Sequence, residues 1–334
     1  MKIIFITRLF YPHVGGVEKH VERVGSELIK KGYEVTVLTT KFKREFVREE
    51  IYRKLKIIRF YQPKIRFLGL ISTWVWLVKN RRLLLDKDII HIHDVFIWYW
   101  PLKLIYPKKS VFLTYHGRWG KYPITLVDKL QKKIGAKYSS GVICIGDYIP
   151  KNYGIKADFI SYGAVDTPAK KFKKENRLII YVGRLDNDIA LAKILKVFEK
   201  LKKEYEIVFV GDGAMAGEAK KIGKVTGFTD PIPYYKRAKY LFASGYLTIL
   251  EGLAYRCRIF TMYENRLQED YYKTPNLKRL ITISGSYEEI LKKFIRTDID
   301  IKKVEQGYKW VKDQNWEKMS ENYLMLWKYI RIRE

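Results

Sequence analysis

The sequence predicts an α/β protein with two consecutive domains, each built on a parallel β-sheet. Short apolar runs that end in glycine or polar residues alternate with helical segments, and a length of 334 residues exceeds one ordinary domain. A polar, proline-containing stretch at 160–177 separates a first series of these units from a second. Because parallel sheets bind ligands beyond the carboxyl ends of their strands, the residues after each strand are the first site candidates.

The first series begins with a strand, a helix and a second strand. The helix is predicted from Gly15 to Gly32, because Val17, Val21 and Leu28 recur on one helical face and the second glycine ends it. Continuous apolar runs predict buried strands at 2–7, 33–40, 88–93, 110–117 and 141–146.

The second series repeats the alternation, and it ends in a helical tail at 304–332 with Trp310, Trp316 and Trp327 as apolar anchors. Helices are predicted at 191–203 and 247–254. Strands are predicted at 178–186, 205–213, 223–228, 240–245, 258–263 and 279–284.

Composition limits the class of protein. A net charge of +29 indicates an anionic partner (nucleic acid, an acidic membrane or a phosphorylated substrate) or a thermophile-like composition rich in Lys, Ile and Tyr. Two isolated cysteines, Cys144 and Cys257, predict buried free thiols and exclude a disulfide framework. The N-terminal apolar run is too short for a signal peptide, and 67–78 is too short for a membrane span, so we expect a soluble or peripheral protein.

Two candidates lie in the first series. Gly15 and Gly16 precede the first helix, where backbone N–H groups bind an anion, although a lone glycine pair also forms ordinary turns. His116 ends a strand, where it either donates to a substrate hydroxyl or phosphate or is satisfied locally. His91 and His93 suggest a metal, but no further ligands cluster beside them in the sequence, so we expect none.

The second series supplies further candidates. Gly183 and Arg184 follow a strand, and a guanidinium there suits a diphosphate because it binds two oxygens at once. Gly213 lies in a tight turn after another strand. Glu251 lies on a predicted helix, where it either accepts hydrogen bonds from a ribose diol or is an ordinary solvated or salt-bridged glutamate.

Taken in order, these segments resemble glycosyltransferase family 4, the retaining GT-B sugar-nucleotide transferases. The resemblance covers nearly the whole chain and includes "YPHVGGVEKHV", "DIIHIHD", "YHG", "SYGAVDTPAKKF", "YVGRLD", "VGDG", "VTGF" and "LTILEGLA". It implies two Rossmann-like domains whose parallel sheets face each other across a cleft: an acceptor domain at 1–163, a nucleotide-sugar domain at 164–309, and a last helix at 310–334 that returns to the first domain.

The resemblance also implies roles for individual residues. His116 lies beside the transferred sugar, and Arg184 contacts the diphosphate; these two are the catalytic candidates. No metal and no cofactor beyond the nucleotide-diphosphate sugar is implied. The donor-binding candidates are Gly15, Gly16, Gly183, Arg184, Gly213, Thr226, Gly227, Phe228, Leu250 and Glu251.

The sequence departs from the family pattern at two places. Family members usually carry a lysine five or six positions after the arginine, where this chain has Ile189 and Ala190; Lys193 is one helical turn further on. They also usually carry a first glutamate eight positions before the second, where this chain has Ala243, in a loop that looks shortened to "ASGYL".

Three functions are compared. We expect a retaining hexosyltransferase, cytoplasmic and peripheral on the inner face of the membrane, that acts on a glycan or lipid-linked glycan. The alternative is a weak or inactive GT-B protein that binds a nucleotide sugar or a partner. Nucleic-acid binding through the basic stretch 41–67 is not expected, because Glu45, Glu49 and Glu50 interrupt it. The segment 67–78 is either a core helix or an interfacial amphipathic helix that binds anionic membranes.

Overall fold

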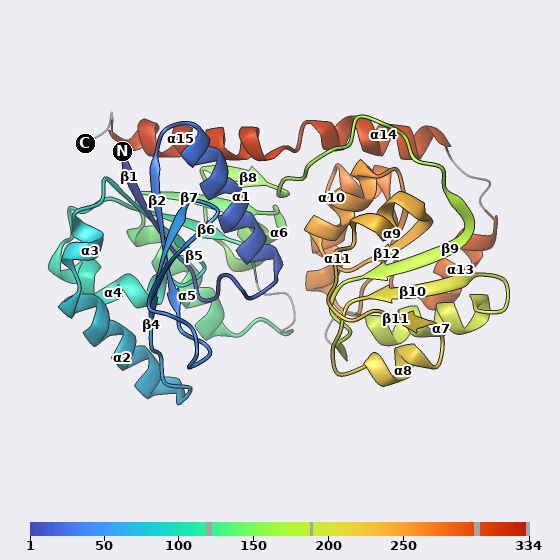
Figure 1. Cartoon of the computed structure of the whole chain (residues 1–334), viewed down its shortest axis with the longest axis horizontal. Coiled ribbons are helices and arrows are strands. Elements are labelled where there is room, and N and C mark those ends of the chain that lie inside the picture. Colours follow the sequence, from blue (N-terminus) through green and yellow to red (C-terminus); the bar gives the residue numbers. More distant parts are fainter. Residues whose placement is uncertain (118–121, 188–189, 297–300, 332–334) are drawn as a thin grey trace. The chain divides into compact units, whose positions relative to one another are not determined.

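The structure is a computed structural model that describes residues 1–117, 122–187, 190–296 and 301–331. The chain forms two compact units (Figure 1). Unit 1 contains Met1–Gly117, Ile124–Ser161 and the chain from Trp316 onward, and unit 2 contains Tyr162–Asn315 and a short stretch before Ile124. The predicted α/β class with two parallel-sheet domains is confirmed.

Unit 1 is a sheet with helices packed against it. Within the described residues its strand order is β3-β4-β2-β1-β5-β6-β7-β8, parallel except for the β3–β4 pair. The strands are β1 (Lys2–Ile6), β2 (Glu34–Thr40), β3 (Glu49–Tyr52), β4 (Leu55–Phe60), β5 (Ile89–His93), β6 (Val111–Tyr115), β7 (Gly141–Ile145) and β8 (Phe159–Ser161). The helices are α1 (Gly16–Lys30), α2 (Arg66–Lys79), α3 (Arg82–Leu85), α4 (Phe96–Ile105), α5 (Leu126–Tyr138), α6 (Tyr148–Tyr153) and α15 (Trp316–Arg331).

Unit 2 is a smaller sheet in the order β11-β10-β9-β12-β13-β14, with every described pair parallel. The strands are β9 (Glu175–Val182), β10 (Glu206–Val210), β11 (Lys224–Val225), β12 (Ala238–Ala243), β13 (Arg258–Met262) and β14 (Thr282–Ser284). The helices are α7 (Leu191–Leu201), α8 (Ala216–Lys220), α9 (Ile232–Arg237), α10 (Tyr246–Ala254), α11 (Arg266–Tyr272), α12 (Leu277–Leu280), α13 (Tyr287–Arg296) and α14 (Ile301–Lys312).

The basic stretch 41–67 folds into a hairpin that the sequence analysis did not predict. Arg53 and Lys54 both have positive φ and form the two-residue turn between β3 and β4. The Arg59 side chain is fully buried and donates to Glu50 at 3.0 Å and to the Tyr11 carbonyl at 2.7 Å. Part of the positive charge of this stretch is therefore paired within unit 1.

The C-terminal tail is two helices rather than one. Trp310 lies on α14 of unit 2, whereas Trp316 begins α15 of unit 1. Between them the Gln314 carbonyl accepts a hydrogen bond from the Val165 N–H at 2.8 Å, so the chain leaves the helical path where it meets the polypeptide that follows β8. In unit 1, α15 lies beside α1 (Figure 1).

Candidate functional site

Gly15 and Gly16 begin α1 at the carboxyl end of β1. Gly15 precedes the helix with extended backbone and has no side chain to cap the first helical N–H groups. A side chain at Gly16 would meet no heavy atom within 4 Å, whereas one at Gly15 would meet the Glu18 carboxylate. The N–H groups at a helix start attract anions, because the helix dipole places partial positive charge there.

Glu18 lies in the same first turn and opposes that attraction. Its carboxylate folds back toward Gly15, and its Oε1 lies 3.1 Å from Nδ1 of His13. Burial raises the pKa of the Glu18 carboxyl, although its own backbone N–H and His13 oppose the shift. An anion that binds here has to displace or neutralise this carboxylate.

Four of the five histidines form a cluster in unit 1, in which His20, His91 and His93 are buried and His116 is half-buried. His91 and His93 lie on β5, His116 follows β6, and His20 lies on α1. The His116 ring centroid lies 5.3 Å from that of His93 and 4.7 Å from that of His20. Nδ1 of His93 lies 3.0 Å from Nε2 of His116, so one of these two nitrogens donates to the other. A second histidine therefore holds the predicted catalytic histidine.

Helix α15 completes the cluster. The Trp327 indole N–H donates to Nδ1 of His91 at 3.1 Å, so the neutral His91 carries its proton on Nε2. That nitrogen donates to Oγ1 of Thr114 at 2.7 Å, and the Thr114 hydroxyl then donates to Tyr323 at 2.8 Å. The Tyr323 hydroxyl is left to donate to Nε2 of His20 at 2.9 Å. One directed chain of hydrogen bonds thus runs from α15 to α1.

The cluster is neutral near pH 7. Burial lowers the pKa of His20, His91 and His93 well below its usual value, and neighbouring histidines add to the effect. For His116, burial and the positive charge of Lys132 lower the pKa to about 3. A neutral imidazole donates one hydrogen bond and accepts another.

The sequence shows no further ligands beside His91 and His93, but the fold brings His20 and His116 next to them. Even so, within the part of the chain that the structure describes, no group of three or more His, Cys, Asp or Glu side chains is arranged to hold a metal ion. In the cluster, ring nitrogens bond one another, hydroxyls and an indole instead.

The turn after β6 fixes the His116 backbone. The His116 N–H donates to Oδ1 of Asp94 at 3.0 Å, and Asp94 itself has a left-handed φ of 62°. Nζ of Lys132 lies 3.8 Å from the same oxygen. Gly117 has a φ of 85°, and any side chain there would overlap the Tyr148 hydroxyl. The conformation of this strand end therefore requires glycine after the histidine.

Three predicted motifs meet at the carboxyl ends of β9, β10 and β11 in unit 2. The Gly183 N–H donates to the Val210 carbonyl at 3.2 Å, and Gly211 forms an antiparallel bridge with Gly227. A side chain on Gly211, whose φ is 159°, would overlap the Gly183 carbonyl. Gly213, with a φ of 157°, is restricted in the same way. These turns approach so closely only because glycine forms them.

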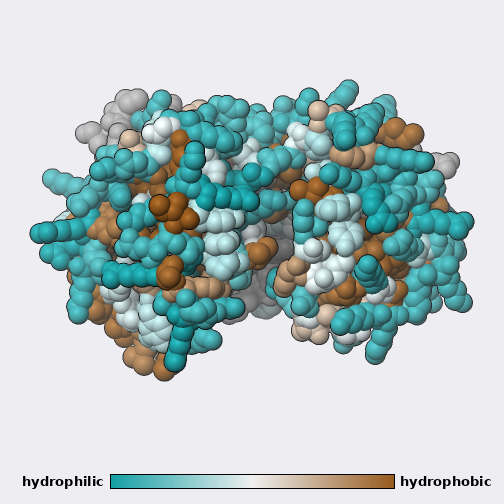
Figure 2. All heavy atoms as spheres, in the orientation of Figure 1, coloured by the Kyte–Doolittle hydropathy of each residue, from teal (hydrophilic) through white to brown (hydrophobic). Residues whose placement is uncertain are grey.

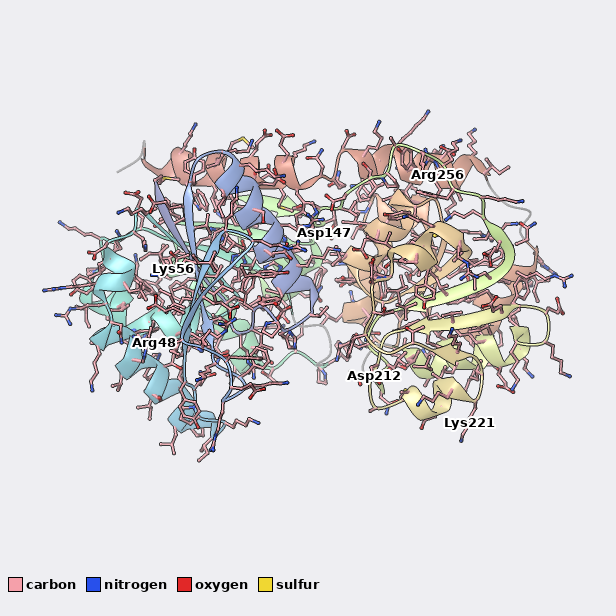
Figure 3. The ribbon with its side chains drawn as sticks, in the orientation of Figure 1. Arg48, Lys56, Asp147, Asp212, Lys221 and Arg256 are labelled. Atoms are coloured by element: carbon pink, nitrogen blue, oxygen red, sulfur yellow. The ribbon has the colours of Figure 1, made fainter. Side chains whose placement is uncertain are left out.

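Polar side chains surround the turns. Arg184 is exposed, and its guanidinium lies 2.8 Å from the Asp186 carboxylate. Asp212 lies between the two glycines after β10 (Figure 3), and its Oδ1 accepts from the Gly213 N–H at 2.8 Å. A diphosphate at this edge would meet Arg184 together with two carboxylates.

Thr226, Gly227 and Phe228 follow β11. The Thr226 N–H and the Phe209 carbonyl are bonded at 3.0 Å, and the Thr226 hydroxyl donates to the Gly227 carbonyl at 3.0 Å. Gly227 has a left-handed φ of 73°. The Phe228 side chain is 65% exposed, so its ring is open to a ligand.

Glu251 and Leu250 lie on α10, and both are buried. Oε2 of Glu251 accepts a hydrogen bond from the Tyr235 hydroxyl at 2.9 Å, and this carboxylate is 9% exposed. Burial and then the Glu251 charge raise the pKa of Tyr235, so the phenol stays the donor. The Leu250 side chain is 1% exposed and packs beside Gly163, so it is enclosed by protein.

The short loop before α10 leaves no space for the usual first glutamate. Ala243 ends β12 and is 1% exposed, and only Ser244 and Gly245 separate it from the helix. The Tyr272 hydroxyl donates to the Ser244 carbonyl at 3.0 Å, and Oγ of Ser244 lies 3.3 Å from the Tyr181 hydroxyl. Two tyrosines thus fix this loop.

Lys193 does not supply the free cation that the sequence suggested. Its ammonium donates to the carbonyls of Tyr263 and Gly285 at 3.0 and 2.9 Å. Ile189, one of the two positions of the usual lysine, lies outside the described residues, and Ala190 is fully buried.

Sequence reasoning missed His20, Tyr323 and Tyr235 as neighbours of candidate residues. His20 lies one helical turn after the glycine pair, so its helix pointed toward the same strand ends. No sequence signal linked either tyrosine to its partner. Tyr323 is 303 residues from His20, and Tyr235 is 16 residues from Glu251.

The chain is similar to known proteins in sequence over residues 14–153 and in structure over its whole length. Residues 14–153 match the model of Glycosyltransferase Family 4. A comparison with curated proteins found no match. A solved sucrose-phosphate synthase from Thermosynechococcus elongatus has a similar fold, with a TM-score of 0.77, 16% identity and 100% of both chains covered. A glycosyltransferase from Rickettsia africae has a TM-score of 0.70 at 16% identity, with 98% of both chains covered.

A third similar structure contains ligands. The Anabaena protein HepE, in complex with UDP and glucose, has a TM-score of 0.69 at 12% identity, covering 97% of this chain and 99% of that one. The family model matches within unit 1, and the structural similarity extends through unit 2. Residues 14–153 are thus similar to glycosyltransferase family 4, and the whole chain has the GT-B fold of these glycosyltransferase structures.

Proposed function

We propose that the chain transfers a sugar from a nucleoside-diphosphate sugar to an acceptor with retention of the anomeric configuration. The main support is the meeting of the motifs around Gly183, Gly211 and Gly227 at the carboxyl edge of the unit 2 sheet. Parallel sheets bind ligands at this edge. The similar Anabaena structure contains UDP and glucose.

In this proposal Arg184 stabilises the negative charge that develops on the leaving diphosphate, so that no metal ion is needed. The exposed Phe228 ring lies against the base, and Glu251 accepts hydrogen bonds from the ribose. Because Oε2 of Glu251 already accepts from Tyr235, the ribose and the tyrosine share one carboxylate.

His116 acts as a neutral hydrogen-bonding group. With a pKa of about 3, only about one imidazole in ten thousand is protonated at pH 7. Its role is therefore to position a sugar hydroxyl through Nδ1, because Nε2 is already bonded to His93. It does not serve as a general acid at neutral pH.

The acceptor, in our proposal, is a glycan or lipid-linked glycan at an anionic membrane. Among the described helices, none has both the length and the hydropathy needed to cross a bilayer. Helix α2, however, buries Thr73 and Leu77 while it exposes Phe67, Leu68 and Ile71, 72%, 54% and 50% of which are accessible. Figure 2 shows hydrophobic side chains at the lower end of unit 1, where α2 lies.

Basic side chains flank this exposed apolar face. Lys64 precedes the helix, Lys79 is its last residue and Arg81 follows it, and all three are exposed. Such a face binds the surface of an anionic bilayer through apolar insertion and charge attraction. In this proposal one face of the helix packs in unit 1 and the opposite face contacts the membrane.

A weak or inactive nucleotide-sugar-binding protein is the second candidate. The buried Ala243 and the bound Lys193 both favour it, because the chain lacks these family groups at the positions expected. Hydrolysis of the donor, or transfer of its sugar at any detectable rate, separates an enzyme from this alternative.

The first experiment is a thermal-shift screen of UDP-, GDP-, ADP- and TDP-sugars, since a ligand that binds only the folded chain raises the melting temperature. The donor identified in this way is then used in a transfer assay. Arg184→Ala should abolish most of the shift, and Arg177→Ala, which removes an exposed arginine from the start of β9, should leave it unchanged. No shift with any of the four nucleotides, or equal shifts in both variants, would contradict the proposal.

A further inference from the structure

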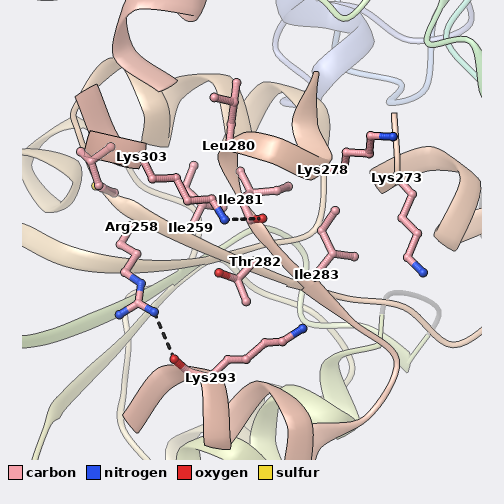
Figure 4. A pocket seen from close by; sticks show the side chains of 12 residues that line it. Arg258, Ile259, Lys273, Lys278, Leu280, Ile281, Thr282, Ile283, Lys293 and Lys303 are labelled. Atoms are coloured by element: carbon pink, nitrogen blue, oxygen red, sulfur yellow. Dashed lines mark hydrogen bonds between the residues drawn. The ribbon is translucent and has the colours of Figure 1, made fainter. Parts of the chain in front are cut away.

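A pocket of about 480 Å³ lies at the opposite edge of the unit 2 sheet from the donor motifs. It is lined by the first residues of β13 and of the edge strand β14, and by residues of α12, α13 and α14 (Figure 4). Since the strands are parallel, their first residues lie at the amino edge of the sheet. The ends of β13 are about 13 Å apart, and the donor motifs follow β9, β10 and β11 toward the other side of the sheet. The pocket is thus separate from the proposed donor site.

Positive charge dominates this pocket. None of its twelve described lining residues is acidic, and five are cationic. An anion that enters this cavity is therefore attracted by several positive charges at once. The cationic residues are Arg258, Lys273, Lys278, Lys293 and Lys303.

At least two of these side chains have carboxylate neighbours. Lys273 pairs with Glu269, and Lys293 pairs with Glu289, each one helical turn away and partly exposed. Such exposed pairs hold each other weakly, typically by less than about 1 kcal/mol. An anion in the pocket can therefore draw either lysine to itself at little cost.

The remaining contacts orient the cations. Nζ of Lys303 donates to the Ile281 carbonyl at 3.2 Å, and Nη2 of Arg258 donates to the Lys293 carbonyl at 3.1 Å. Figure 4 shows Thr282 lying among the ends of Arg258, Lys293 and Lys303. A threonine hydroxyl between a guanidinium and two ammonium groups offers several donors to one tetrahedral anion.

We propose that this pocket is a second binding site that takes a small organic phosphate. Arg258, Lys293 and Lys303 bind the phosphoryl oxygens, because a guanidinium fork and ammonium groups match them in charge and geometry. Apolar side chains of Ile259 and Ile283 also line the pocket, and they accommodate the carbon skeleton that a bare inorganic ion lacks. The phosphate belongs either to a free ester or to the headgroup of an anionic lipid.

The test measures pyrophosphate binding to the full chain by isothermal titration calorimetry near physiological salt, where non-specific attraction is screened. One double variant, Lys293→Gln with Lys303→Gln, removes two pocket charges. The matched control, Lys292→Gln with Lys302→Gln, removes two exposed charges from the adjacent positions of the same helices. We expect the pocket variant to bind at least about tenfold more weakly and the control to bind as the parent does.

Arg184→Ala separates this site from the donor site, because pyrophosphate also resembles part of a nucleotide. Pocket binding should persist in Arg184→Ala whether or not that variant binds nucleotide sugars. Far-UV circular dichroism and melting temperature establish that each variant folds. Equal weakening in the two lysine pairs, or loss of pyrophosphate binding in Arg184→Ala alone, would overturn the proposal.

Vesicles distinguish the two sources of phosphate. If the ligand is a lipid headgroup, the pocket variant, but not its control, should lose binding to phosphatidylcholine vesicles that contain phosphatidic acid. If it is a free ester, glycerol phosphate should compete with pyrophosphate, and the vesicles should bind both variants alike. Binding of neither probe to the parent would exclude the site.

Discussion

Acidification should destabilise unit 1 through its buried histidines. In the folded chain the pKa values of His20, His91, His93 and His116 lie below the ordinary value of 6.5, so the neutral forms are favoured. The unfolded chain takes up these protons as the pH falls through about 6.5. The stability contributed by the neutral cluster is therefore fully present above that pH and is lost below it.

The magnitude follows from the number of histidines. Each proton bound only by the unfolded chain lowers the free energy of unfolding by about 1.4 kcal/mol per pH unit. Four such protons amount to about 5 kcal/mol between pH 7.5 and 5.5, which is comparable with the whole stability of an ordinary domain. The carboxyl groups whose pKa is lowered by ion pairs, such as Glu175 and Glu269, titrate below this window.

Urea unfolding monitored by tryptophan fluorescence at several pH values measures this loss. The signal reports mainly on unit 1, which contains Trp74, Trp76, Trp98, Trp100, Trp316 and Trp327. His116→Asn should reduce the pH dependence by about one proton, or about 1.4 kcal/mol per pH unit. An unfolding free energy that stays constant from pH 7.5 to 5.5, or an unchanged slope in His116→Asn, would refute the reasoning.

Three further predictions concern the proposed activity. His116→Ala should lower sugar transfer by orders of magnitude while nucleotide affinity stays near that of the parent, and unchanged turnover would remove this histidine from the site. Glu251→Ala should weaken nucleoside-diphosphate binding about thirty- to a hundredfold, from a loss of about 2–3 kcal/mol, and should also lower the melting temperature because it removes the acceptor of the buried Tyr235 O–H; Glu251→Gln should do less of both. Phe67→Ser with Ile71→Ser should reduce sedimentation with anionic vesicles, whereas recovery equal to that of the parent would exclude α2 as the membrane contact.

The fold was largely predictable, because buried parallel strands are continuous apolar runs that no solvated segment imitates. The β3–β4 hairpin was missed for the opposite reason. Its strands contain many charged residues, and its turn, Arg53–Lys54, adopts positive φ without the glycine or asparagine that usually marks such turns. Its burial depends on a tertiary contact, the enclosure of Arg59 by Glu50 and a carbonyl, which no local pattern reveals.

The candidate site was predictable only where the backbone conformation restricts the residue type. Gly211, Gly213 and Gly117 are glycines because any side chain would overlap neighbouring atoms, and such residues remain visible in a single sequence. The partners of Glu251 and His20 are tyrosines that meet them only after folding. Tyrosine is common in this chain, so neither position carried a signal.

The missing first carboxylate has a structural reason in unit 2. Ala243 is 1% exposed, and the two-residue loop that follows it is held through Ser244 by the hydroxyls of Tyr181 and Tyr272. A glutamate at this position would place an unpaired charge in the core, at a cost of several kcal/mol. The loop is therefore built around a small residue, and one substitution cannot restore the usual carboxylate. Any transfer that this chain performs must rely on the diphosphate contacts rather than on an acid at this position.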